Sequence, residues 1–206
     1  MLLADIGNTH FHIYEGASIE HISYEDAFSK YANKNLKYIC VNPKIEKKLE
    51  QMEAWENIAD LLTIQGEYDT MGVDRKALCL SHKTGLFVDA GSAITVDVVK
   101  DGIYQGGFIL PGLKAYQESY KNISPVLDYP LNTSLSLAHL ATTTKEQISY
   151  GIIASIKALI DKHSKGHILY FTGGDGKFLA NFFEEAIYDE TLVFLGMQHA
   201  LKTTSR

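Results

Sequence analysis

An Asp-x-Gly sequence occurs twice in this chain, each time directly after a short apolar segment. The first copy is Asp5 to Gly7 and the second is Asp89 to Gly91. In each copy a small polar residue follows the glycine, and two more strand-like segments come next in the sequence. Three strands followed by helices and strands in alternation, twice over, predict an α/β protein made of two related halves.

Alternating or continuous apolar patterns and turn residues define the expected elements. The halves are not separated by a linker rich in Pro, Gly or Ser, so we place the boundary near Thr84 and Gly85. The predicted domains are residues 1–84 and 85–206, with a cleft between them. The expected strands are residues 1–5, 11–16, 18–22, 36–42, 59–64, 85–91, 93–100, 102–110, 167–173 and 191–196; the expected helices are residues 24–33, 43–55, 73–83, 113–121, 144–163, 176–186 and the end of the chain.

Composition excludes several classes of function. The net charge of -6, without a cluster of Lys or Arg, argues against binding to nucleic acid, which requires dense positive charge. The apolar run at the N-terminus stops at Asp5, too short for a signal peptide, and the longest later run, 152–160, contains Lys157. Cys40 and Cys79 are typical of buried, reduced thiols. We therefore expect a cytoplasmic protein that acts on small molecules.

The two Asp-x-Gly turns are candidates for phosphate binding. Glycine lets backbone amides approach an anion, the side chain of Asn8, Thr9 or Ser92 adds a donor, and the aspartate can hold a cation. The alternative is a pair of hairpin turns in which Asp and Asn bond only their own backbone. The duplication favours the phosphate-binding interpretation.

Two further segments carry chemically useful residues. TGGD, 172–175, lies between an apolar strand and a helix, where α/β proteins commonly bind ligands, although Gly-Gly also suits a plain connection. GVDR, 72–75, pairs a carboxylate with a guanidinium at the start of a predicted helix. Arg75 could hold a substrate carboxylate and Asp74 could act as a general base. A helix-capping aspartate beside a surface arginine is the alternative.

Taken in order, DIGNT, GVDR, DAGSAITVD, GGFILPG and TGGD resemble the corresponding segments of the type III pantothenate kinases over nearly the whole chain. That family belongs with acetate and sugar kinases, heat-shock ATPases and actin. The resemblance therefore implies an α/β fold of two ribonuclease-H-like, actin-like ATPase halves with mixed sheets, flanking helices and a nucleotide cleft. It also implies phosphorylation of pantothenate by ATP to 4'-phosphopantothenate, the first step towards coenzyme A, by a homodimer.

The same resemblance implies roles for individual residues. Asp74 would be the catalytic proton acceptor, Asp89 the ligand of a potassium or ammonium ion, and Asp5 the neighbour of the nucleotide's Mg²⁺. Thr144 would contact substrate, across a dimer interface. The implied ATP-binding residues are Asp5, Ile6, Gly7, Asn8, Thr9, His10, Phe11, His12 and Ser92; the implied substrate-binding residues are Tyr68, Gly72, Val73, Asp74, Arg75 and Thr144.

The chain departs from the family pattern at three points. Ser92 stands where the family usually has threonine, which keeps the hydroxyl. Tyr68 lies closer to GVDR than the family's substrate-contacting tyrosine does. The first half is also shorter than in most relatives. Each departure concerns the details of the pocket and leaves the implied reaction unchanged.

Other interpretations of these residues remain open. His10 and His12 project to the same side of a strand, as metal ligands would, but a third ligand is not recognisable nearby. Another small-molecule kinase of the same superfamily would share the two Asp-x-Gly turns. A non-catalytic nucleotide-binding regulator would also share them but would not need Asp74 as a base.

Overall fold

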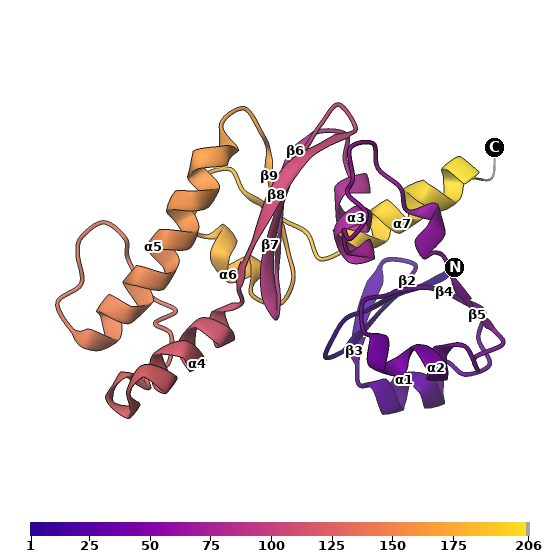
Figure 1. Ribbon diagram of the computed structural model, residues 1–206, viewed down its shortest axis with the longest axis horizontal. Helices are drawn as coiled ribbons and strands as arrows, with labels where there is room; N and C mark the ends of the chain where they lie inside the picture. Colours follow the sequence, from indigo (N-terminus) through magenta and orange to yellow (C-terminus); the bar gives the residue numbers. More distant parts are fainter. Residues whose placement is uncertain (205–206) are drawn as a thin grey trace. The chain divides into compact units, whose positions relative to one another are not determined.

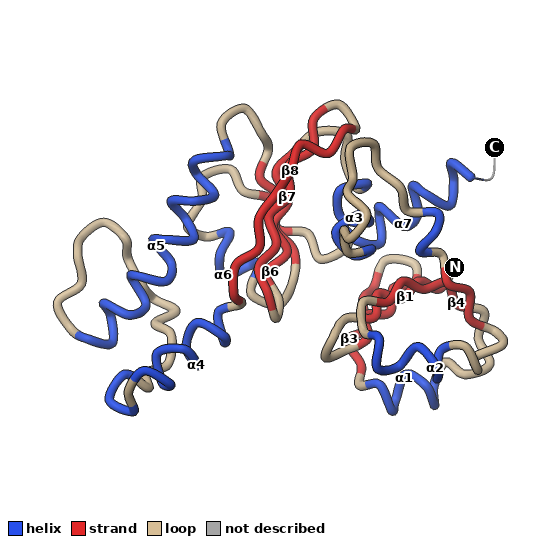
Figure 2. The backbone as a smooth tube through the Cα atoms, in the orientation of Figure 1, coloured by secondary structure: helices blue, strands red, loops and turns tan. Residues whose placement is uncertain are grey.

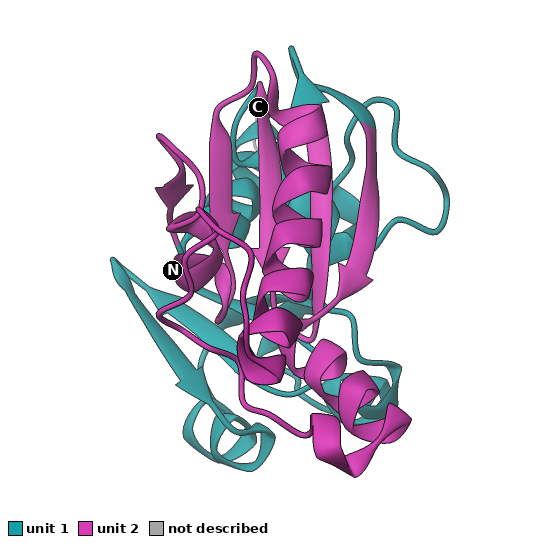
Figure 3. Cartoon of the chain, turned by 90° about the vertical axis from the view of Figure 1, so that its left-hand side faces the viewer, with its two compact units in different colours: residues 1–83, 99–105, 190–206 teal, residues 84–98, 106–189 magenta. Residues whose placement is uncertain are grey.

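A computed structural model describes residues 1–204 of the chain and divides it into two compact units, coloured separately in Figure 3. Unit 1 consists of residues 1–83, 99–105 and 190–206, and unit 2 of residues 84–98 and 106–189. The predicted boundary at residue 84 would place the final segment in the second half. The compact units do not test where one duplicated half ends and the next begins, so the boundary near residues 84 and 85 stays a prediction.

Unit 1 is built on a five-stranded mixed sheet with the strand order β3-β2-β1-β4-β5 (Figures 1 and 2). β1 pairs with β2 antiparallel and with β4 parallel, so the carboxyl ends of β1 and β4 lie side by side. The elements are β1 (Leu2–Ile6), β2 (Phe11–Glu15), β3 (Ser18–Ile22), α1 (Tyr24–Lys30), β4 (Leu36–Cys40), α2 (Glu46–Leu49), β5 (Trp55–Asn57), α3 (Val73–Leu80) and α7 (Leu192–Thr204).

The two faces of this sheet are covered by different helices. Alternate residues of β1 and β2, including Ile6 and Phe11, pack with α1 in an apolar cluster around Trp55. The opposite face receives α7, whose Phe194 stacks on Tyr14 of β2 with ring centroids 5.2 Å apart. Because successive side chains of a strand alternate between faces, Asp5 and His12 lie on the α7 side.

Unit 2 contains a second five-stranded sheet, with the order β10-β9-β6-β7-β8. Apolar residues of β6, β7 and β9 form one core with Ile152, Ile153, Ile156 and Ile160 of α5, the long helix in Figure 1. The elements are β6 (Gly85–Ala90), β7 (Ala93–Lys100), β8 (Ile103–Pro111), α4 (Leu113–Ile123), α5 (Thr144–Ser164), β9 (Leu169–Thr172), α6 (Gly176–Ala180) and β10 (Ile187–Tyr188).

The two sheets share one topology. Reading from the same edge, β3-β2-β1-β4-β5 corresponds to β8-β7-β6-β9-β10. The parallel pairs also correspond, since β1 with β4 and β4 with β5 match β6 with β9 and β9 with β10. The predicted α/β fold with two related halves is therefore confirmed.

Four predicted elements differ from the structure, and one of them, the helix expected over 176–186, ends at Ala180. Residues 191–196 were expected to form a strand, but Leu192 begins helix α7 and Thr191 precedes it. Residues 59–64 were also expected as a strand, and their first part forms a short 3-10 helix, Ala59–Leu61. The helix expected over 43–55 is reduced to a 3-10 turn, the four-residue α2 and the strand β5. The segments 59–64 and 191–196 are short apolar runs, which do not distinguish a buried strand from a buried helical turn, so tertiary packing decides there.

Within residues 1–204, none of the helices combines the length and apolar character needed to cross a lipid bilayer. The longest helix, α5, carries Lys145, Lys157 and Lys162 along its course.

Candidate active site

The first Asp-x-Gly sequence forms the turn between β1 and β2. The N–H of Gly7 donates to the carbonyl of His10 at 3.1 Å, and the carbonyl of Gly7 accepts from the Tyr24 hydroxyl at 2.6 Å. Ile6 and Phe11 have no exposed surface and belong to the core. Within the predicted ATP-binding segment 5–12, only the backbone groups of these two residues could therefore contact a ligand, because their side chains are buried.

His12 is a neutral side chain in this fold. Its Nδ1 atom lies 2.6 Å from Nδ1 of its cross-strand partner His21, an arrangement in which one ring must donate and the other accept. Burial, followed by the proximity of His21 and His10, lowers the pKa of His12 to about 4. Near neutral pH, His12 therefore carries no positive charge. Among the described residues, no group of three His, Cys, Asp or Glu side chains could hold a metal ion, so the pair of His10 and His12 has not gained a third ligand.

GVDR begins α3, with Gly72 as the residue before its first turn. The Oδ1 atom of Asp74 accepts a hydrogen bond from the backbone N–H of Arg75 at 2.8 Å. A Cβ atom on residue 72 would lie 2.5 Å from that same Oδ1, so a larger residue there would force the Asp74 carboxylate to shift. Asp74 thus lies in the first turn of α3 rather than at its N-cap position, and the contact with the Arg75 N–H orients its carboxylate.

Arg75 is a buried arginine, with 7% of its surface exposed, and two tyrosines hold its guanidinium. Nη1 donates to the Tyr68 hydroxyl at 2.5 Å and Nη2 donates to the Tyr104 hydroxyl at 3.3 Å. The surface-arginine alternative is therefore wrong. The segment that carries Tyr68 is tied to α3 by an ion pair of 2.7 Å between Glu67 and Lys76.

Tyr104 is the residue of this cluster that sequence reasoning missed. It lies at the start of β8, and its N–H donates to the carbonyl of Gln65 at 2.8 Å. Gly66 has a φ of +87°, and a Cβ there would lie 2.8 Å from the Tyr104 carbonyl. Gly66 was the signal in the sequence that could have pointed to this contact, because an isolated glycine often marks a close approach of two backbones.

The second Asp-x-Gly sequence and TGGD lie together at one end of the sheet in unit 2. Asp89 of β6 is the register partner of Thr172 in β9. A Cβ on Gly173 would lie 2.4 Å from the Asp89 Oδ1 atom, and the N–H of Asp175 donates to the carbonyl of Ala90 at 2.9 Å. Burial raises the pKa of Asp175. The two loops therefore pack against each other at the carboxyl ends of β6 and β9.

Ser92 is joined to the same group of loops through Gly112, the last glycine of GGFILPG. The N–H of Gly112 donates to the Ser92 carbonyl at 3.2 Å, and a Cβ on Gly112 would lie 2.4 Å from the Gly91 carbonyl. The structure places Thr144 elsewhere in unit 2, at the exposed first position of α5. Thr143 caps that helix by accepting from the N–H of Glu146.

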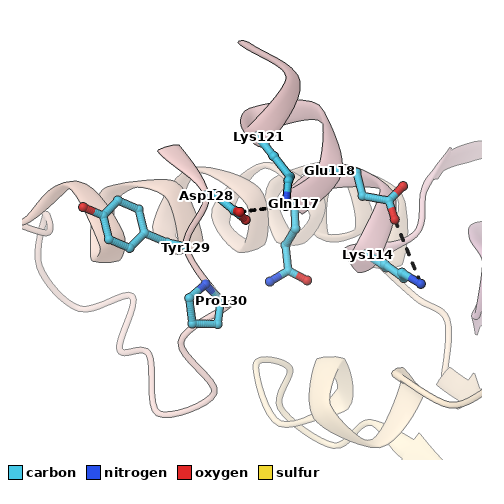
Figure 4. Close-up of a pocket in the computed structure, with 7 residues that line it drawn as sticks. All are labelled: Lys114, Gln117, Glu118, Lys121, Asp128, Tyr129 and Pro130. Atoms are coloured by element: carbon cyan, nitrogen blue, oxygen red, sulfur yellow. Dashed lines mark ion pairs between the residues drawn. The ribbon is translucent and has the colours of Figure 1, made fainter. Parts of the chain in front are cut away.

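A pocket of about 320 Å³ lies beside α4 (Figure 4). Two of its lining residues, Lys121 and Asp128, form an ion pair of 2.8 Å. The residues that line it are Lys114, Gln117, Glu118, Lys121, Asp128, Tyr129 and Pro130, and none of them is a predicted site residue. The pocket and the predicted site are therefore separate features.

Comparison with solved structures identifies the class of fold. The chain superposes on a structure from Sinorhizobium meliloti, provisionally named as a 2-dehydro-3-deoxygalactonokinase, with a TM-score of 0.58 and 10% identity. The alignment covers 98% of this chain and 96% of that one. The fold is that of the actin-like ATPases and sugar kinases, in agreement with the duplicated sheets.

Comparison of sequences identifies the family. Residues 33–165 match the family model described as type III pantothenate kinase. A protein of that name from Helicobacter hepaticus is 44% identical over 203 residues, which cover 98% of each chain. The chain belongs to the type III pantothenate kinase family. A solved structure from Campylobacter jejuni, provisionally named as a Baf family transcriptional activator, is 38% identical with a TM-score of 0.90 and covers 100% of this chain and 99% of that one.

Proposed function

We propose that this chain transfers the γ-phosphoryl group of ATP to pantothenate and forms 4'-phosphopantothenate, the first step of coenzyme A biosynthesis. The observation that carries the proposal is the buried Arg75, held by two tyrosine hydroxyls directly beside Asp74, in a member of this family. A guanidinium with a fixed orientation suits the carboxylate of pantothenate. The adjacent carboxylate suits the acceptor hydroxyl.

In the proposed reaction, Asp74 accepts the proton of the primary hydroxyl of pantothenate. That oxygen forms a bond to the γ-phosphorus while the bond from the γ-phosphorus to the β,γ-bridging oxygen breaks, and ADP leaves with the electron pair. Kinases require little covalent chemistry from the protein, so positioning and electrostatic stabilisation supply most of the acceleration. Gly72, Val73, Arg75 and Tyr68 hold the substrate, and Thr144 contributes a further contact.

We assign the nucleotide to the two loops that contain the Asp-x-Gly sequences. Residues 5–12 and Ser92 bind the phosphates of ATP, and TGGD lies near the base. The proposed cations fit the donors present, because Asp5 and Asp89 supply carboxylate oxygens and the backbone beside Asp89 supplies carbonyl oxygens, which hard cations prefer. We assign Mg²⁺ with its nucleotide to Asp5 and a potassium or ammonium ion to Asp89. When bound, these cations offset the negative charge of the phosphates.

The proposal is tested by release of ADP from the purified protein supplied with ATP and Mg²⁺. We expect turnover only when both pantothenate and potassium are present, with sodium unable to replace potassium. Turnover with pantothenate in sodium alone would remove the cation role of Asp89 and leave the kinase. ADP release that does not depend on pantothenate would contradict the assigned substrate.

The contact between Tyr104 and Arg75 gives a second prediction. We expect Tyr104→Phe to raise the KM for pantothenate about fivefold, because Arg75 loses one of the hydroxyls that orient it, at a cost of about 1 kcal/mol. The KM for ATP should stay within twofold. Tyr129→Phe removes an exposed hydroxyl beside α4 and should change neither constant. Equal changes in both KM values for Tyr104→Phe would contradict a specific role in the pantothenate site.

Two alternatives are kept. Another small-molecule kinase of the superfamily would use the same fold, and a panel of acceptor alcohols distinguishes it. A non-catalytic nucleotide-binding regulator is favoured by the name of the Campylobacter jejuni structure alone. A regulator would bind ATP without releasing ADP when pantothenate is added.

We also propose that the chain acts in the cytoplasm as a homodimer. Exposed apolar side chains on and after α4, among them Ile123, Val126 and Leu140, support a surface covered by a second copy. Sedimentation of the purified protein tests the oligomeric state.

A further inference from the structure

The turn between β1 and β2 is held by side chains from two other segments of unit 1. The Tyr24 hydroxyl donates to the carbonyl of Gly7 at 2.6 Å and accepts from Nδ2 of Asn42 at 2.9 Å. Tyr24 is the first residue of α1, and Asn42 follows the carboxyl end of β4. A chain of hydrogen bonds thus runs from the loop after β4 to residues 5–12, the first of the two proposed phosphate-binding loops.

The orientation of Asn42 is fixed by its own contacts. It has 6% of its surface exposed, and its Oδ1 atom accepts from the backbone N–H of Lys44 at 3.0 Å. Its backbone N–H lies 3.3 Å from the sulfur of Cys40. Because Oδ1 must face a donor, Nδ2 is directed at the Tyr24 hydroxyl, which is then left to donate to Gly7.

Tyr24 also contacts the other end of the same loop. Its ring packs edge-on against the ring of Phe11, with centroids 5.3 Å apart and an angle of 81° between the planes. The hydroxyl therefore holds the loop where it leaves β1, and the ring holds it where it enters β2. Phe11 itself is fully buried, which makes this second contact part of the rigid core.

We propose that Tyr24, oriented by Asn42, is a positioning residue that holds the first phosphate loop in its nucleotide-binding conformation. Glycine at position 7 gives the loop backbone freedom, and loop amides bind an anion tightly only when they are oriented in advance. The hydrogen bond to the Gly7 carbonyl supplies that orientation. The inference rests on the proposed function, because it assumes that residues 5–12 bind the phosphates of ATP.

The test is Tyr24→Phe, which removes the hydroxyl and keeps the ring on Phe11. We expect the KM for ATP, and the dissociation constant for ATP measured by calorimetry without pantothenate, to rise about tenfold. A tenfold change corresponds to about 1.4 kcal/mol. The KM for pantothenate at saturating ATP should stay within twofold, which general damage to unit 1 would not allow.

Tyr14→Phe is a matched control from the neighbouring turn. The Tyr14 hydroxyl also donates to a glycine carbonyl, that of Gly16 at 2.9 Å, but in the turn between β2 and β3. We expect Tyr14→Phe to leave ATP affinity unchanged. If both variants weaken ATP binding equally, the effect belongs to the stability of the sheet and the proposal is wrong.

A second variant tests the role of Asn42. Asn42→Ala should also weaken ATP binding about tenfold, and the double variant should show about the same loss, since both changes act through one hydroxyl. Losses that multiply to about a hundredfold would overturn the proposed connection between Asn42 and Tyr24.

The calorimetric measurement separates this inference from the proposed reaction. If Tyr24→Phe weakens ATP binding in a protein that does not phosphorylate pantothenate, the positioning role stands and the assigned reaction fails. If the protein phosphorylates pantothenate and Tyr24→Phe binds ATP as the unaltered chain does, the reaction stands and the positioning role fails.

Discussion

Asp74→Asn is expected to lower kcat at least a hundredfold while the affinity for ATP changes less than about threefold. General base catalysis contributes about 10² to 10⁴ in rate, and an amide cannot accept the proton of the substrate hydroxyl. The substitution is otherwise mild, because asparagine keeps the Oδ1 oxygen that accepts from the N–H of Arg75 at 2.8 Å. ADP release under saturating substrates and calorimetric binding of ATP measure the two quantities.

A matched control is available in another helix. Asp26 lies in the first turn of α1, and its carboxylate accepts from the Ser23 hydroxyl at 2.6 Å. We expect Asp26→Asn to keep kcat within twofold. If Asp74→Asn also keeps its turnover, Asp74 is not the proton acceptor, and the carboxylate serves only to accept the backbone N–H of Arg75 in the first turn of α3.

Gly196→Ala is expected to destabilise the protein by about 3 kcal/mol or more. Gly196 lies in α7 at its closest approach to α3, where an added Cβ would be 1.7 Å from the carbonyl oxygen of Ala77 and 2.6 Å from its carbon. No rotamer can relieve contact with a backbone atom, so the two helices must separate, and forced overpacking of this kind costs about 1–3 kcal/mol or more. Urea unfolding monitored by circular dichroism measures the loss.

The same substitution at Gly151 provides the comparison. Gly151 lies within α5, and a Cβ there would meet the Tyr120 hydroxyl at 3.8 Å, an ordinary contact. Because alanine is the better helix former, Gly151→Ala should stabilise the protein by about 0.5–1 kcal/mol. Equal responses at the two positions would show that α3 and α7 separate without cost. Since α3 carries Asp74 and Arg75, we expect Gly196→Ala to weaken turnover as well.

The duplicated architecture could be predicted from the sequence, because each Asp-x-Gly sequence is followed by strands whose side chains alternate. The same reasoning from local apolar patterns gave the wrong element at α7, which was expected to begin as a strand. Leu192, Val193 and Phe194 are all buried, so the segment has the unbroken apolar character of a central strand. Only its packing against α3, which requires Gly196, distinguishes it as a helix.

The candidate site could likewise be predicted only in part. GVDR and the two turns are local motifs, and their residues could be proposed from residue type and spacing. The contact between Tyr104 and Arg75 joins residues 29 positions apart, and it depends on the pairing of Gln65 with Ile103. Long-range register of this kind leaves no periodic signal in a single sequence.

The division of unit 1 among residues 1–83, 99–105 and 190–206 has a consequence for the order of assembly during synthesis. The ribosome makes the first sheet early, but the helix that covers its Asp5 face is α7, which follows unit 2 in the sequence. Unit 2 has all of its residues before that helix exists. The Asp5 face of the first sheet therefore stays uncovered by α7 until all the residues of unit 2 have been made.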